Sequence, residues 1–203
     1  MIRGGFRRLI RRVRIVVLVA SDNASGLISP PGFRFTRISA SNPEADHRLA
    51  DEAMRAAEEP DGLVASRLAH GDEFFGWLAG DRIVSFGWVT YRDRVIGPTR
   101  LAETPERAFL FNFYTRKEYR GQGLYPALLL AIRRVLGREQ MTEFVISVLD
   151  RNLASIRGID KAGFFPVAQV SYFLLFDRWY CCSKRTLVTA AAKSLFVADC
   201  TCK

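Results

Sequence analysis

The chain has 203 residues, of which 49% are hydrophobic, 12% aromatic and 25% charged. This balance is typical of one globular domain with its own core, and it argues against a chain that is disordered throughout or that spans a membrane, since its apolar runs are too short. The net charge of +9 lies in residues 1–20 and 181–203, so the body is neutral and bulk charge does not indicate a nucleic-acid partner.

The N-terminal segment combines six arginines with apolar residues at helical spacing. These apolar residues are Phe6, Leu9, Ile10, Val13, Val16, Val17 and Ala20. The pattern predicts that residues 1–20 form a basic amphipathic segment of helical periodicity. Three interpretations stay open: an extension without a role of its own, a weak contact with an anionic membrane surface, or a signal peptide, for which the apolar stretch 15–20 is short. Residues 21–32 are rich in Ser, Gly and Pro and are predicted to complete this extension as a linker.

From residue 33 the chain alternates between strand and helix patterns. Strands are predicted at 33–39, 74–79, 83–91, 108–115, 144–149 and 167–176. Helices are predicted at 42–57, 61–69, 124–136 and 152–162, the first of them opening on Asn42-Pro43-Glu44. Gly80-Asp81 separates the second and third strands and indicates a hairpin, whereas residues 93–106 are expected to be a polar connection. The order predicts a single α/β (α+β) domain of about 145 residues.

The segment that carries chemistry is Tyr119-Arg120-Gly121-Gln122-Gly123-Leu124-Tyr125, between a predicted strand and a predicted helix. Two glycines one residue apart allow a tight turn, and amides at a helix start can hold an anion. Arg120 adds a full positive charge, and Pro126 suits a first helical turn. The segment predicts a phosphate or pyrophosphate site, with a plain turn as the alternative. Its spacing differs from those of the P-loop and of the dinucleotide fingerprint.

Two segments resemble the GNAT superfamily of N-acyltransferases. Residues 115–129 (TRKEYRGQGLYPALL) are similar to the family's Arg/Gln-x-x-Gly-x-Gly/Ala pattern, with Tyr125 in place of the last small residue. Residues 152–164 are similar to N-x-x-A-I-x-x-Y-x-K-x-G-F, with matches at Asn152, Ile156, Lys161, Gly163 and Phe164. The resemblance covers about residues 33–178. It implies a mixed, mostly antiparallel twisted sheet flanked by helices, with residues 179–203 as a tail outside the domain.

The resemblance implies an enzyme that moves an acyl group from acetyl-CoA, its acyl-donor substrate, to a primary amine of a small molecule, an amino sugar or a protein. The pantetheine arm would run beside the end of the strand at 108–115, and the pyrophosphate would bind the glycine loop. Asn152 would contact the arm, or cap its helix, or do both. The expected cofactor-binding residues are Phe113, Tyr114, Thr115, Arg120, Gly121, Gln122, Gly123, Leu124, Tyr125 and Asn152.

Catalytic residues are less well defined by the sequence. The position at which the family often has a tyrosine, seven residues after that asparagine, holds Ile159, which cannot protonate a thiolate. Tyr125 and Tyr172 are candidate substitutes. Acids expected near the cleft are Glu73, Asp93, Glu103 and Glu106. The predicted catalytic set is Glu73, Glu106 and Tyr172. A protein that binds acyl-CoA without turnover is the alternative that Ile159 suggests.

The cysteines and the basic arm bear on cofactors and partners. All four cysteines, at 181, 182, 200 and 202, lie in the tail, and their spacing lacks the C-x2-C of a zinc site, so no metal is expected. No nucleic acid is expected either. An acyl carrier protein is an alternative donor, because such carriers are acidic and the basic arm would steer them. A cytoplasmic location is expected, and the oligomeric state stays open, a dimer included.

Overall fold

The computed structural model describes residues 10–21, 29–40, 44–97, 99–175, 178–187 and 195–196. An eight-stranded sheet of order β10-β9-β1-β8-β7-β4-β3-β2 forms its centre, and β5-β6 form a separate pair. The strands are β1 (Ile10–Ser21), β2 (Arg34–Ile38), β3 (Glu73–Ala79), β4 (Arg82–Thr90), β5 (Arg94–Ile96), β6 (Thr99–Leu101), β7 (Arg107–Thr115), β8 (Glu143–Leu149), β9 (Phe165–Leu175) and β10 (Arg178–Thr186). The helices are α1 (Glu44–Ala56), α2 (Leu63–Ala69), α3 (Leu124–Gly137) and α4 (Leu153–Lys161), with a 3-10 turn at Lys117–Tyr119.

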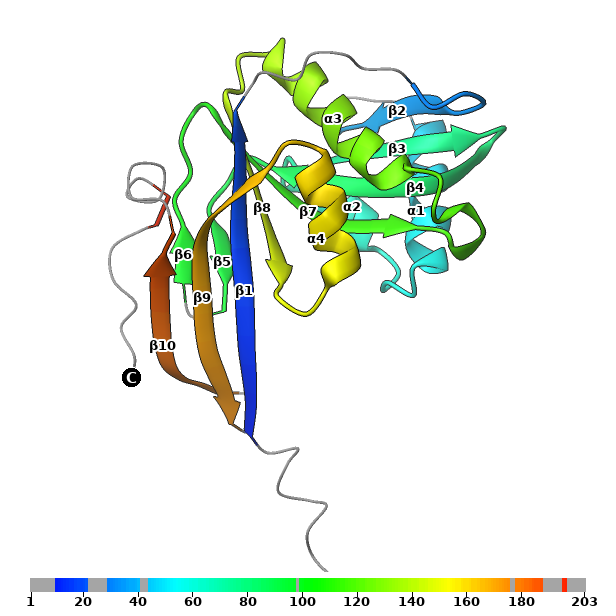
Figure 1. Cartoon of the computed structure of the whole chain (residues 1–203). Helices are drawn as coiled ribbons and strands as arrows, with labels where there is room; N and C mark the ends of the chain where they lie inside the picture. Colours follow the sequence, from blue (N-terminus) through cyan, green and yellow to red (C-terminus); the bar gives the residue numbers. More distant parts are fainter. Residues whose placement is uncertain are drawn as a thin grey trace, which may run out of the picture.

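One parallel pair interrupts an otherwise antiparallel sheet. The β7–β8 pair is parallel, and the other six pairings of the sheet are antiparallel. A parallel pair needs a crossover, which α3 supplies. The β7–β8 register runs from Arg107–Glu143 to Leu110–Ile146 and ends there. The two strands therefore part at Phe111 and Ser147. The mixed, mostly antiparallel sheet flanked by helices is confirmed, and Figure 1 shows α3 and α4 on the same side of it.

Most elements predicted between residues 33 and 176 are confirmed with small shifts of their ends. Gly80 has φ 59° at the turn between β3 and β4, as the predicted hairpin requires. The polar connection expected at 93–106 is corrected, because it contains the hairpin β5–β6. Its strands have three residues each, too few to show a periodic pattern. Asn42 and Pro43 lie outside the described residues, and the helix is described from Glu44.

The helical prediction for residues 1–20 is wrong where the structure describes them. Ile10–Ser21 forms β1, which lies between β8 and β9 and is antiparallel to both. Five of the seven residues from 13 to 19 are β-branched, and such residues favour strands. A central strand is buried on both faces, so it lacks the alternation that marks a half-exposed strand. Arg11, Arg12 and Arg14 lie within this strand, and Arg14 pairs with Asp150 at 2.7 Å.

The C-terminal strand also joins the sheet beyond the limits expected for it. β10 pairs with β9, and Cys181 and Cys182 belong to this strand. Cys200 and Cys202 lie outside the described residues. The tail expected from residue 179 therefore begins with a sheet strand. Within the part of the chain that is described, no helix has both the length and the apolar character needed to cross a bilayer.

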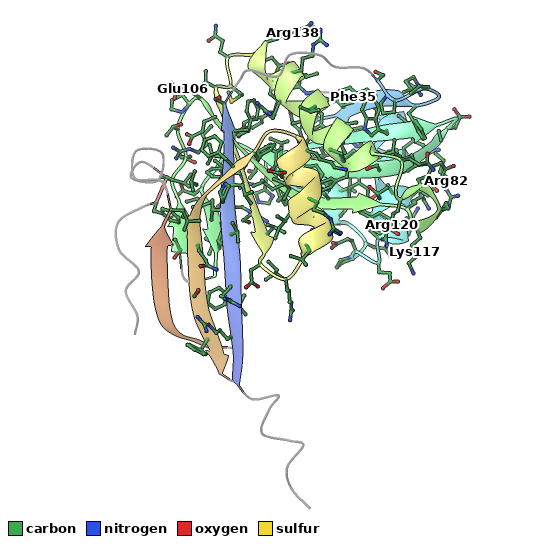
Figure 2. The ribbon with its side chains drawn as sticks, in the orientation of Figure 1. Phe35, Arg82, Glu106, Lys117, Arg120 and Arg138 are labelled. Carbon is green, nitrogen blue, oxygen red and sulfur yellow. The ribbon has the colours of Figure 1, made fainter. Side chains whose placement is uncertain are left out.

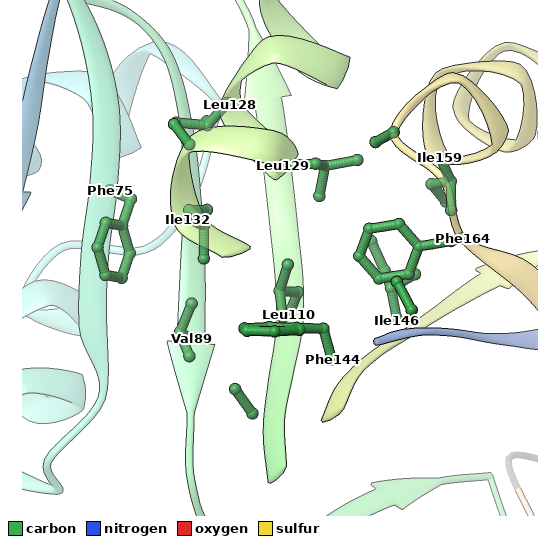
Figure 3. Packing of buried hydrophobic residues seen from close by; sticks show 14 of the residues in the cluster. Phe75, Val89, Leu110, Leu128, Leu129, Ile132, Phe144, Ile146, Ile159 and Phe164 are labelled. Carbon is green, nitrogen blue, oxygen red and sulfur yellow. The ribbon is translucent and has the colours of Figure 1, made fainter. Parts of the chain in front are cut away.

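The two faces of the sheet bury different clusters. Alternate residues of β1 divide between them: Leu18 and Ala20 face the cluster beneath α3 and α4, whereas Val17 and Val19 face the cluster that includes the β5–β6 hairpin. A third cluster lies beneath α1 and α2 and contains Trp88. Figure 3 shows the first cluster, in which side chains of α3 and α4 meet those of the strands. α3 and α4 therefore pack on one face of the sheet, and α1 and α2 pack on the other.

Candidate active site

A cavity of about 570 Å³ lies among the end of β7, the loop before α3 and one face of α4. Nine of the ten residues predicted to bind the cofactor line it, whereas Gln122 does not. The lining residues are Phe113, Tyr114, Thr115, Tyr119, Arg120, Gly121, Gly123, Leu124, Tyr125, Pro126, Asn152, Ala154, Ser155, Arg157, Gly158 and Lys161. The fold therefore gathers residues that lie up to 48 positions apart in the sequence into one site.

The glycine loop has the backbone that its sequence predicts. Gly121 and Gly123 have φ of 81° and 74°, and Gly123 caps α3 without a side-chain hydrogen bond. Amides in the first turn of a helix have no partner within the helix. Arg120 Nε donates to the Thr115 carbonyl at 3.0 Å, which closes the loop onto the end of β7. Trp77 Nε1 donates to the Leu124 carbonyl at 3.2 Å and fixes the start of α3.

The charge of the cavity wall favours an anion. Arg120, Arg157 and Lys161 line the cavity, and no Asp or Glu is among the residues that line it in the described ranges. The positive end of the α3 dipole points to the same place. Because unlike charges attract most strongly where protein walls exclude water, the cavity suits a ligand that carries several negative charges.

Tyr125 occupies the wall between α3 and α4. Its hydroxyl lies 3.1 Å from Ser155 Oγ, and its ring centroid lies 5.3 Å from that of Phe113. A Cβ at Gly158 would lie 2.5 Å from Tyr125 Cδ1, so only glycine leaves room for this ring. Burial raises the pKa of Tyr125 to about 12, partly offset by the hydrogen bond with Ser155. The phenol therefore stays protonated at neutral pH and is available as a hydrogen-bond donor.

We expect this raised pKa to make stability depend on alkaline pH. The pKa of tyrosine is about 10 in an unfolded chain, so the folded state holds this proton more tightly and stability falls as the pH rises from about 10 to 12. Tyr125→Phe removes this titrating group. Between about pH 10 and 12 the free energy of unfolding should therefore fall by about 1–2 kcal/mol less in the variant than in the parent. Urea unfolding at pH 9 and pH 11.5 measures the difference, and both states hold the proton at pH 9. Equal losses in the two proteins would contradict the prediction.

The face of α4 that lines the cavity was predicted only at Asn152, the residue that precedes the helix. Asn152 Oδ1 accepts a hydrogen bond from the Ser155 amide at 3.2 Å, which confirms its helix-capping role. Sequence reasoning did not assign Ser155, Gly158 and Lys161 to the site, although Lys161 matched the resembled motif; all three line the cavity, as do Ala154 and Arg157 of the same helix. The separation of Ser155, Gly158 and Lys161 by three residues is the spacing of one helix face, and this signal would have identified them once Asn152 was placed.

The tyrosine position of the resembled motif does not face the cavity. Ile159 is completely buried in the core cluster, and Figure 3 shows it near Phe164 and Leu129. Tyr172, predicted to be catalytic, belongs to the cluster on the opposite face of the sheet. Its ring fills the space in which Gly97 lacks a side chain, since a Cβ there would lie 2.4 Å from Tyr172 Cε1. Of the two candidate tyrosines, Tyr125 lines the cavity and Tyr172 does not.

The predicted acids lie away from the cavity. Both oxygens of Glu73 accept hydrogen bonds from Arg37, at 2.8 and 3.0 Å, and Tyr91 donates a third at 2.9 Å. Arg37 also pairs with Glu139, just beyond the C-terminal end of α3, whereas the cavity lies at its N-terminal end. Glu106 is exposed and lies on the other side of the molecule from Arg120 (Figure 2). Neither glutamate lines the cavity, and their catalytic roles stay predictions.

Asp93 and Glu103 stabilise the β5–β6 hairpin. The Asp93 amide donates to Glu103 Oε2 at 3.1 Å, and the Glu103 amide donates to Asp93 Oδ1 at 2.9 Å. This reciprocal pair closes the open end of the hairpin. Among the residues that the structure describes, no group of three or more His, Cys, Asp or Glu side chains is placed to hold a metal ion.

Comparison with protein-family models identifies one family. A family model described as the acetyltransferase (GNAT) family matches residues 38–164. A GCN5-related N-acetyltransferase from Sphaerobacter thermophilus is similar with TM-score 0.58 and 20% identity, over 84% of this chain and 54% of that one. An acetyltransferase from the GNAT family of Colwellia psychrerythraea is similar with TM-score 0.59 and 15% identity, over 82% and 57%.

A tandem GNAT protein from the clavulanic acid biosynthesis pathway is similar with TM-score 0.57 and 16% identity, over 80% of this chain and 53% of that one. The chain spans about half the length of these solved structures. No curated protein matches the chain. At these identities the structures establish the fold, and the family model, which covers more than half of the chain, establishes the family. This protein belongs to the acetyltransferase (GNAT) family.

Proposed function

We propose that the protein transfers an acyl group, most simply acetyl, from CoA to a primary amine. The observation that carries this proposal is the convergence of nine predicted CoA-binding residues around one cavity, whose lining in the described ranges includes basic but no acidic side chains. The left-handed glycine loop at the start of α3 offers open amides to the pyrophosphate. Arg120, Arg157 and Lys161 would balance the negative charges of the nucleotide end.

The pantetheine arm would follow the free edge of β7. The pairing of β7 with β8 ends at Leu110, whereas β7 pairs with β4 on its other side as far as Thr115. The edge of residues 111–115 that faces away from β4 thus offers backbone groups to a linear amide-containing ligand. If the pyrophosphate of CoA binds at the glycine loop, the pantetheine arm attached to it follows this edge of β7. The thioester at the end of the arm then lies where β7 and β8 part.

Proton movements follow from the groups present. The amine forms a C–N bond to the thioester carbon, the C–S bond breaks, and the sulfur leaves as thiolate. Because no carboxylate lines the described cavity, we propose that the amine reacts from its neutral fraction and releases its second proton to water. A thiol has a pKa of about 8.5, well below that of Tyr125, so Tyr125 would stabilise the thiolate by a hydrogen bond rather than by full proton transfer.

Thiol release from acetyl-CoA in the presence of a panel of primary amines tests this proposal. The expected result is amine-dependent release whose kcat/KM rises about tenfold per pH unit below the pKa of the amine, since only the neutral amine attacks. Tyr125→Phe should lower kcat more than it raises the KM for acetyl-CoA. Acetyl-CoA binding without release on any amine would favour the non-catalytic binding module, and absence of binding would refute both. The cytoplasmic location and the oligomeric state stay predictions.

A further inference from the structure

Two arginines converge on one aromatic ring on the face of the sheet opposite to α3 and α4. The guanidinium carbon of Arg94 lies 4.1 Å from the ring centroid of Phe111, and that of Arg67 lies 5.1 Å from the same centroid. Arg67 also lies 4.9 Å from the centroid of Trp88. Arg67 comes from α2 and Arg94 from β5, so three separate elements build this cluster.

Arg67 and Arg94 are half-buried, and their guanidinium groups lack acceptors among the described residues. Neither Arg67 nor Arg94 makes an ion pair within 4 Å or a side-chain hydrogen bond to any described residue, and Arg67 Nη1 is buried without a partner. Burial lowers the pKa of both arginines, and Arg94 lowers that of Arg67 further. An arginine has five donors in a fixed fork, so an unfilled pair of forks is well suited to a planar oxyanion.

The cluster lies next to the expected position of the thioester. Phe111 is the first residue of β7 after the last β7–β8 pair, at Leu110. Leu110 packs in the cluster beneath α3 and α4, whereas Phe111 packs against the cluster beneath α1 and α2. A CoA arm on the α3–α4 side leaves the opposite face for the second substrate. An amine that reaches the parting strands from that face passes the two arginines.

The charge balance suits a ligand with one negative charge. Asp72 is buried and pairs with Arg92 at 3.0 Å, and it also attracts Arg67 and Arg94 from a longer distance. Glu59 attracts Arg67 in the same way. Three arginines and two acids leave one uncompensated positive charge. We propose that Arg67 and Arg94 bind a carboxylate of the acceptor, so that the acceptor is an amine bearing a carboxylate, such as an amino acid. This inference rests on the proposed function.

Calorimetric titration of the full chain with N-acetyl amino acids, which would be the products, tests the site independently of turnover. The probes are the N-acetyl derivatives of glycine, leucine and phenylalanine and their carboxamides, each with and without saturating CoA. We expect at least one acid to bind at least about tenfold more tightly than its amide, and this preference to vanish in Arg67→Gln/Arg94→Gln. Arg100→Gln is the control, because Arg100 is an exposed arginine on the adjacent strand β6, paired with Asp93.

Equal affinity for acids and amides in the parent protein, or an acid preference that survives in the double variant, overturns the inference. If the double variant does not fold, Arg94→Gln alone replaces it, since Arg94 lies on the short hairpin β5–β6. A parent protein that fails to bind CoA but prefers the acids keeps the arginine site and refutes the proposed function. A parent protein that binds CoA and releases thiol only with amines that lack a carboxylate keeps the proposed function and refutes the site.

Discussion

Replacing Gly123 with aspartate is expected to weaken acetyl-CoA binding by at least about a hundredfold. Gly123 stands at the start of α3 with φ 74°, and a Cβ added to it would meet no atom within 4 Å, so a side chain there extends into open space. A carboxylate at this point repels the pyrophosphate and competes for the same amides. Two charge-assisted hydrogen bonds of about 1.5 kcal/mol or more each account for the expected loss. Isothermal titration calorimetry measures it.

Gly62→Asp provides a matched control for backbone strain. Gly62 caps α2 with φ 77° and likewise has no atom within 4 Å of an added Cβ, yet it does not line the cavity. Both variants should therefore lose similar stability from a non-glycine residue in the left-handed region, about 1–2 kcal/mol. Only Gly123→Asp should lose acetyl-CoA binding. If both variants bind as the parent does, the loop before α3 is a turn and not a phosphate site.

The second large effect concerns β1. Val17→Asp should destabilise the folded protein by more than about 4 kcal/mol, because Val17 is fully buried between Ser147 of β8 and Ala168 of β9. A carboxylate at this position would lie within a cluster of hydrophobic side chains, where water does not hydrate it. Urea unfolding followed by circular dichroism measures the change. If Val17→Asp is not recovered folded, Val17→Thr keeps the shape and should cost about 1–3 kcal/mol through its buried hydroxyl.

Ser147→Asp is the matched control for this variant. Ser147 lies directly opposite Val17 in the β1–β8 register but is exposed to solvent. The same new carboxylate should therefore cost about 1 kcal/mol or less there, which is the range of strand propensity. An N-terminal extension that adds nothing to the fold would make the two variants equally stable, and that result would contradict the position of β1 in the sheet.

The course of the chain between residues 33 and 176 follows from local patterns. The β3–β4 hairpin is predictable because Gly80-Asp81 stands between two aromatic, β-branched runs. β1 is not predictable in the same way. Its apolar residues satisfy a helical spacing and a buried strand equally well, and only the gap between β8 and β9 decides between them. A short stretch of sequence carries no information about strand partners that come from distant parts of the chain.

The candidate site likewise contains residues that are predictable from their neighbours in the sequence and residues that only the fold brings together. The loop of residues 119–125 is predictable because glycines, an arginine and a helix start are adjacent in the sequence. The positions of Glu73 and Tyr172 are not predictable in this way, because their contacts with Arg37 and Gly97 join distant parts of the chain, and their catalytic roles stay predictions. The Arg67–Phe111–Arg94 cluster is equally hidden, since its members come from three elements that only the fold brings together.

Hydrogen–deuterium exchange of the full chain, with and without saturating acetyl-CoA, tests most directly the claim that the α3–α4 cavity binds the acyl donor. We expect protection of peptides that cover residues 113–125 and 152–161, because these segments line the cavity. Peptides that cover α2 and the β5–β6 hairpin, on the other face of the sheet, should exchange at unchanged rates. Protection confined to other parts of the chain, or no protection at saturating ligand, would contradict binding of the acyl donor in this cavity.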